Sequence, residues 1–193
     1  DASNPVVNLL RVKRDIGSSS TIGAVYTDRT TPGEGFNRVV GTDARLVLGG
    51  RYTVEMLAAA SADGATGAST DLGSLLRASV NRSSRTLSMN ASFEDTTDDF
   101  IAGSGFIRRV GVTQARARTG YTFRGERGAF LESWGPSLEM DGTWTREDFW
   151  AGRGPLETDY QLGLNGFFRG NIGAFLNYSR QSYNFGSEYY DAY

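Results

Sequence analysis

The sequence alternates between apolar and polar residues in one short segment after another. Residues 86–94, TLSMNASFE, show this pattern most cleanly, and their apolar positions are Leu87, Met89, Ala91 and Phe93. Successive side chains of a β-strand point to opposite faces, so such a segment has one apolar and one polar face. The pattern predicts a strand that separates an apolar from an aqueous environment, either in a half-buried sheet or in the wall of a membrane barrel.

About ten segments of this kind follow one another, and no convincing helix is predicted between them. Tight links such as Gly49 and Gly50, or residues 169–171, alternate roughly with longer polar connections. The longer predicted connections are residues 61–73, 95–106 and 146–155. Sequential hairpins of this kind predict an all-β fold, an antiparallel, up-and-down sheet.

Composition removes several classes of function. Among the 193 residues there is no cysteine and no histidine, which excludes thiol catalysis, disulfide scaffolds and the usual zinc sites. The 20 basic and 22 acidic residues nearly cancel, so we expect no nucleic-acid partner, and no cofactor is indicated. No run of about 18 apolar residues is present for a membrane-spanning helix, whereas barrel strands need only about 10 residues each.

Charged residues recur in mid-strand on the predicted polar faces. In a barrel they would line an aqueous lumen, where they could bind a solute or select ions. Mutual ion pairs that fill the lumen and hold the strand register are the favoured interpretation. These residues are Asp43, Arg45, Glu55, Arg77, Glu94, Arg116, Arg118, Glu139, Asp141 and Asp159.

Aromatic residues near the predicted strand ends favour a membrane barrel, because barrels carry aromatic girdles at both membrane interfaces. A soluble β-sandwich also alternates and also has a polar outer surface, so a soluble all-β binding module is the alternative. The aromatic residues are Tyr26, Tyr52, Phe93, Tyr121, Phe123, Tyr160, Phe168 and Tyr178.

Two connections carry residues that could bind a ligand. Trp144, Phe149 and Trp150 could stack on sugar rings, although packing within the connection is favoured. The acidic cluster of Glu94, Asp95, Asp98 and Asp99 could supply oxygen ligands to calcium, but its spacing matches no EF-hand and a solvated connection is favoured. We expect no metal site and no enzymatic activity.

Four segments resemble, in order, a family of large bacterial outer-membrane proteins: residues 10–29, 36–59, 103–111 and 133–138. In that family a sugar-binding-like β-sandwich, similar to family 9 carbohydrate-binding modules, precedes a C-terminal β-barrel of unknown function. The resemblance implies a transmembrane β-barrel in the bacterial outer membrane. The sugar-binding-like domain is absent from this chain, so residues 1–193 are expected to form a single barrel domain or part of a larger barrel.

Together these features predict an outer-membrane barrel, surrounded by the lipid bilayer, that passes or docks a solute. The family architecture implies a carbohydrate or another small solute, and other subunits of a surface complex as further partners. A purely structural anchor within such a complex is the third interpretation that the sequence leaves open.

Overall fold

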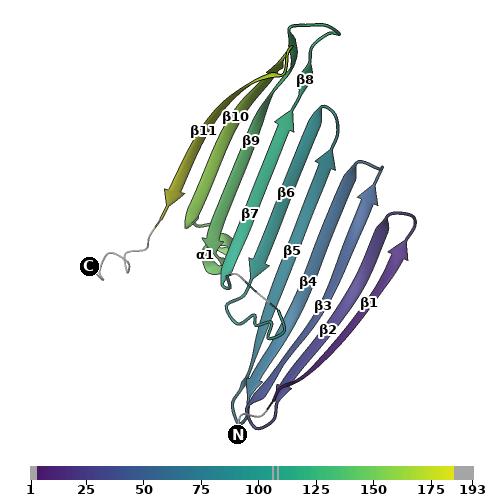
Figure 1. The fold of residues 1–193 in the computed structure, drawn as a ribbon. Coiled ribbons are helices and arrows are strands. Elements are labelled where there is room, and N and C mark those ends of the chain that lie inside the picture. Colours follow the sequence, from purple (N-terminus) through teal and green to yellow (C-terminus); the bar gives the residue numbers. More distant parts are fainter. Residues whose placement is uncertain (1–3, 106, 108, 185–193) are drawn as a thin grey trace. The chain divides into compact units, whose positions relative to one another are not determined.

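The computed structural model describes residues 4–105, 107 and 109–184. Its strands follow one another as one antiparallel sheet in the order β1-β2-β3-β4-β5-β6-β7-β9-β10-β11, and the short β8 pairs with β9 (Figure 1). The predicted all-β, up-and-down sheet is therefore confirmed. The strands are β1 (Val6–Ile16), β2 (Ser20–Thr31), β3 (Gly35–Leu48), β4 (Tyr52–Ala65), β5 (Thr70–Ser83), β6 (Leu87–Thr96), β7 (Val112–Tyr121), β8 (Phe123–Arg124), β9 (Leu131–Thr145), β10 (Glu157–Phe168) and β11 (Ile172–Tyr183).

Contacts divide the chain into two compact units. The first comprises Asp1–Ser79 and Phe93–Thr113, and the second comprises Val80–Ser92 and Gln114–Tyr193. The first unit holds β1 to β4 and the connection between β6 and β7. The second holds most of β7 and all of β8 to β11, while β5 and β6 contribute residues to both.

The strand register sorts the side chains into two faces. In β1 to β4, Leu10 pairs with Tyr26, Tyr26 with Val40 and Val40 with Ala60, so one row of apolar residues crosses four strands. Even-numbered residues of these strands form this apolar face, and odd-numbered residues form the polar face. The same rule holds in β9 to β11, where Leu138 pairs with Leu162.

The prediction of a long connection at residues 61–73 is wrong. β4 continues through Ala65 and β5 begins at Thr70, which leaves a turn at residues 66–69. The small polar residues have the composition of a loop, but Ser61 occupies a polar-face position and its Oγ accepts the Ile101 amide at 3.1 Å. Ser61 and Gly73 are small where the segment around Phe100 and Ile101 packs directly on them.

The expectation of a chain without helices is also wrong at one place. Residues Arg146–Trp150 form the helix α1, inside the connection predicted from 146. Thr145 is its N-cap, and the Thr145 Oγ1 accepts the Asp148 amide at 3.0 Å, which satisfies a free N–H of the first turn. The described residues include no helix with the length and apolar character needed to cross a membrane.

β6 ends later than the sequence predicts, because Asp95 and Thr96 belong to the strand. Asp95 is buried and its Oδ1 accepts a hydrogen bond of 2.6 Å from the Thr113 hydroxyl. Asp95 is thereby removed from the acidic run of the connection. In the described part of the chain, no group of three acidic side chains is placed to hold a metal ion.

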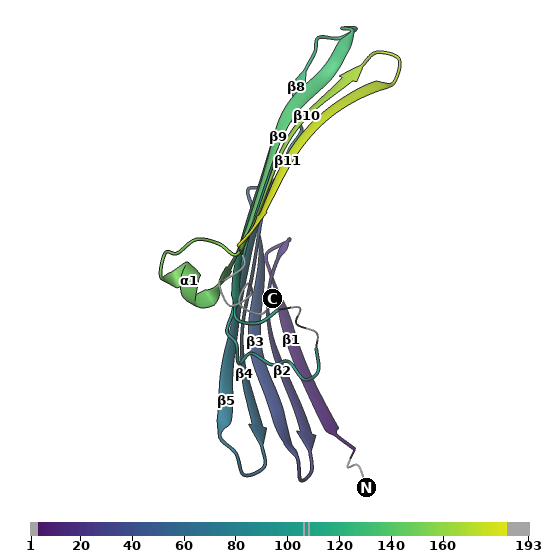
Figure 2. The ribbon, with the colours of Figure 1, turned by 90° about the vertical axis from the view of Figure 1, so that its left-hand side faces the viewer.

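The segment at residues 97–111, called the β6–β7 loop below, lies on the polar face of the first unit (Figure 2). Asn37 holds it twice: its Nδ2 donates to the Ile101 carbonyl at 3.0 Å, and its Oδ1 accepts the Gly103 amide at 2.7 Å. Arg29 donates to the Gly103 carbonyl at 3.1 Å. Three strands therefore fix the path of this loop, since Ser61 of β4 binds it as well. Phe106 and Arg108 lie outside the described residues.

The buried apolar core of the described residues is small and lies beneath this loop. Val39, Leu75 and Phe100 are its buried members, and Phe100 is only 2% exposed. Leu57 and Ala59 pack against them from β4. The core therefore attaches a loop to a sheet and does not join two layers of secondary structure.

We expect Gly73→Ala to release the β6–β7 loop from the sheet. A Cβ at position 73 would overlap the backbone of Phe100, so the loop or β5 must shift, at a cost of about 1–3 kcal/mol. Amide hydrogen exchange at Ile101 and Gly103 should then become faster. Gly154→Ala is the matched control, because a Cβ there meets nothing within 4 Å. Equal exchange in both variants and the parent chain would contradict the docking of this loop.

Candidate functional site

The apolar face of the sheet is open in both units. The described residues show 32 exposed large apolar side chains, and the exposed fraction reaches 61% at Leu10 and 69% at Leu176. Leaving one such side chain about half exposed forgoes roughly 1 kcal/mol of burial. Most of these side chains lie on the apolar face, where together they represent on the order of 20 kcal/mol, more than the net stability of about 5–15 kcal/mol of an ordinary domain. This face needs an apolar environment to contact.

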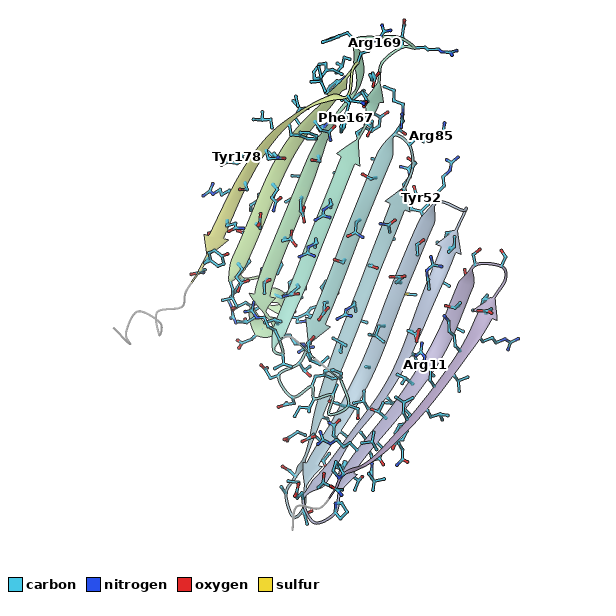
Figure 3. All side chains as sticks on the ribbon, in the orientation of Figure 1. Arg11, Tyr52, Arg85, Phe167, Arg169 and Tyr178 are labelled. Carbon is cyan, nitrogen blue, oxygen red and sulfur yellow. The ribbon has the colours of Figure 1, made fainter. Side chains whose placement is uncertain are left out.

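One tyrosine lies at each end of the apolar band in the first unit. Tyr26 of β2 pairs with Val40 of β3. Tyr52, at the end of β4, pairs with Leu48 of β3 (Tyr52 is labelled in Figure 3). The eight residues from Val40 to Leu48 correspond to about 27 Å along the strand, or about 20 Å if the strand is tilted by about 40°. That height is close to the apolar band of about 25 Å on outer-membrane barrels.

The second unit repeats this spacing. Tyr160 and Phe168 both lie on the apolar face of β10, again eight residues apart. Near the Phe168 end, the Phe123 ring stacks on Trp134 with centroids 4.4 Å apart, and Tyr121 lies 4.7 Å from Phe123. Two units thus show the same separation between aromatic residues, as the girdles at two membrane interfaces require.

A polar row ends the apolar band of the first unit beyond Tyr26. Arg38 Nε pairs with Asp28 Oδ1 at 3.1 Å, and Asn8 donates to the other Asp28 oxygen at 3.3 Å. The Arg38 guanidinium also lies 4.4 Å from the centre of the Phe36 ring. Charged and aromatic residues side by side are typical of the membrane interface, where a long side chain reaches water.

The polar face of the first unit is lined by ion pairs between strands. Arg45 pairs with Glu55 at 3.4 Å, and Arg77 with Glu94 at 2.7 Å. The fifth predicted residue of this unit, Asp43, pairs with a residue that the sequence did not single out, since Arg11 Nη2 lies 2.6 Å from Asp43 Oδ2.

Gly23 makes room for the pair between Arg11 and Asp43, which join β1 to β3 across β2 (Arg11 is labelled in Figure 3). A Cβ at position 23 would lie 2.8 Å from both the guanidinium and the carboxylate. The alternation of apolar and polar residues within single strands does not predict an ion pair between strands that are not adjacent. The glycine opposite Asp43 in the register is the signal that could have revealed it.

These ion pairs border an open depression of about 450 Å³ in the first unit. Lys13 and Ser79 add polar groups to its lining, and Leu57 adds an apolar one. The depression is wide enough for a small polar solute, and its charged side chains can donate and accept hydrogen bonds. It lies on the same polar face as the β6–β7 loop.

The second unit brings its predicted charges together in the same manner. Arg116 pairs with Asp141, and Arg118 Nε donates to Glu139 at 2.9 Å. Asp159 differs, because its hydrogen-bond partner is the neutral amide of Gln181 at 2.7 Å, in a part of the polar face described below. All ten predicted positions therefore carry a polar contact, and nine of them are in ion pairs.

The connection that contains α1 holds the predicted aromatic group. Phe149 lies 5.4 Å from Trp144 and 5.3 Å from Trp150, with both pairs of rings close to perpendicular. The indole of Trp150 remains 63% exposed. The three rings pack on one another as the favoured interpretation expects, and stacking on a sugar stays a prediction.

No protein-family model and no curated protein sequence matches this chain. Among solved structures, the crystal structure of Pseudomonas aeruginosa OccK11 (OpdR) is similar, with 11% sequence identity and a TM-score of 0.48. The match covers 93% of this chain and 54% of that protein, so the chain spans about half the length of the structure it resembles.

The carboxylate of Asp148 organises the connection around α1. The Thr145 hydroxyl donates to Asp148 Oδ2 at 2.6 Å, and Arg153 binds the other oxygen. Thr145 first, and Arg153 second, hold the pKa of Asp148 below its ordinary value. Because the folded state favours the charged form, this stabilisation is complete above the ordinary pKa of an aspartate and is lost as the pH falls through the lowered one.

We expect α1 to loosen in acid only below the ordinary titration range of aspartate. Thr145→Val should raise the pH of loosening, because it removes the largest contribution to the lowered pKa of Asp148. The emission of Trp144 and Trp150, recorded in a Trp134→Phe background, follows the transition. Thr145→Ser keeps the hydroxyl and is the matched control. If the valine and serine variants titrate at the same pH, Asp148 does not govern the transition.

Proposed function

We propose that this chain is part of a bacterial outer-membrane β-barrel that lets small polar solutes pass along its polar face. The observation that carries the proposal is that aromatic residues at the two ends of an exposed apolar band lie eight residues apart in each unit. Lipid would cover that band without any second layer of protein. The polar face, with its ion pairs and its depression, would then meet water.

The lengths of the connections indicate which end of the sheet would face the outside of the cell. Residues 97–111 and 146–156 form the two long connections, and two strands, β7 and β9, separate them in the sheet order. In an antiparallel sheet such connections leave the same end. Bacterial barrels place long loops outside the cell and tight turns in the periplasm, so we assign both connections to the extracellular side.

The β6–β7 loop would narrow the path of solutes along the polar face. It lies on the polar face, held by Asn37, Ser61 and Arg29, and it buries Phe100 against that face. A solute that follows the polar face of the first unit would therefore pass beside this loop and then reach the ion pairs around Asp43.

A soluble binding module would need a second layer to cover the apolar face. The described strands form one sheet, and its buried apolar residues Val39, Leu75 and Phe100 all lie on the opposite, polar side. This observation favours the membrane over the soluble alternative. A purely structural anchor would keep the same faces but would pass no solute.

We also propose that the chain is not an enzyme, because five of its polar-face carboxylates are paired with arginines. The carbohydrate role implied by the family resemblance stays a prediction. Trp150 and its neighbouring rings are the described groups that could stack on a sugar.

We expect the intact protein, inserted into liposomes, to pass small sugars and amino acids but not larger oligosaccharides. Asn37→Ala should raise the flux and the size limit, because it removes both hydrogen bonds that Asn37 makes to the β6–β7 loop. Asn177→Ala, on the polar face of β11, is the matched control. Liposomes that exclude every solute would contradict passage and favour the anchor.

A further inference from the structure

The polar face of the second unit carries two arginines and a larger number of carboxylates. Arg116 is matched by Asp141, and Arg118 by Glu139, so these four charges cancel in pairs. Asp159 of β10 lies directly opposite Asp141 in the strand register. Arg116, which could otherwise have paired with Asp159, is therefore already paired with Asp141.

Asp159 is held by a neutral group. The Gln181 Nε2 donates to Asp159 Oδ2 at 2.7 Å, across the pairing of β10 with β11. The other oxygen, Oδ1, is shielded from solvent and has no hydrogen-bond donor among the described residues. An unsatisfied carboxylate oxygen costs free energy, so a fold that retains one invites a functional explanation. Glu157, on the same face of β10, has the same sign and does not offset Asp159.

The first unit does not supply a compensating charge. Besides the three ion pairs on its polar face, the first unit has Lys13 and Asp15. These two residues lie two positions apart on the polar face of β1, and their charges cancel. Arg29 and Asp63 also balance each other, each in contact with the β6–β7 loop or with its anchor Asn37. Asp71 of β5, and Asp98 and Asp99 of the β6–β7 loop, add further negative charge, so the first unit has no positive excess that would offset Asp159.

We infer that Asp159 is a selectivity-determining residue that makes the path prefer cations over anions. A fixed carboxylate without a bound cation attracts mobile cations and repels anions at the narrow, low-dielectric wall of a lumen. Because Oδ1 itself is shielded from solvent, the carboxylate acts on a passing ammonium group or hydrated metal ion through its electric field. This inference rests on the proposed passage of solutes.

The test is the permeability ratio of potassium to chloride, measured in planar bilayers under a potassium chloride gradient. The parent protein should prefer potassium, and Asp159→Asn should lower the ratio by roughly threefold, as expected when one nearby charge is removed. Gln181→Glu adds a carboxylate beside Asp159 and should raise the ratio. Glu126→Gln changes the same charge in the exposed hairpin at residues 125–130 and should leave it unchanged.

The outcomes separate the two proposals. A parent protein that conducts, but whose ratio is the same after Asp159→Asn and Gln181→Glu, overturns the selectivity inference alone. A parent protein that does not conduct overturns the passage of solutes and with it the selectivity. Opposite shifts in the two variants, with no shift in Glu126→Gln, support the role of Asp159.

Discussion

A β-sheet with one apolar face must bring that face into contact with something other than water, and most features of this chain follow from that requirement. The strand ladders satisfy the backbone groups, but the described residues bury only Val39, Leu75 and Phe100 as apolar core. The exposed apolar band, with aromatic residues at equal spacing in two units, has a height close to that of the apolar band on outer-membrane barrels. Lipid is the simplest solvent for such a surface.

The opposite face solves a different physical problem, which is how to keep charges beside one another without a packed core. Ion pairs between strands neutralise most of them and also oppose slippage of the register. Small residues make the longer contacts possible: Gly23 lets Arg11 reach Asp43 across a strand, and Gly73 lets the β6–β7 loop approach β5. Asp159 is bound by a neutral amide and not by an arginine, so its charge is available to act on a solute.

Much of the fold could be predicted from alternation alone, because a period of two specifies both the strand and its faces. Asp43 and Arg45 of β3, for example, lie on the face that the pattern assigns to them. The strands within residues 61–73 could not be predicted, since the small residues Ser61 and Gly73 contact a loop from far along the sequence. The pairing of Arg11 with Asp43 was missed for a related reason: it joins strands that are not neighbours, and the pattern of one strand contains no information about the next but one.

The central claim is that in β1 to β4 and β9 to β11 the even-numbered face meets lipid and the odd-numbered face meets water. The chain has no cysteine, so single cysteines at Leu162 and Gln161, and at Met56 and Glu55, can carry spin labels without a background. In proteoliposomes, labels at 162 and 56 should respond to oxygen dissolved in the lipid, and labels at 161 and 55 to a water-soluble nickel reagent. Water access at all four positions, or the reverse pattern, would contradict the account.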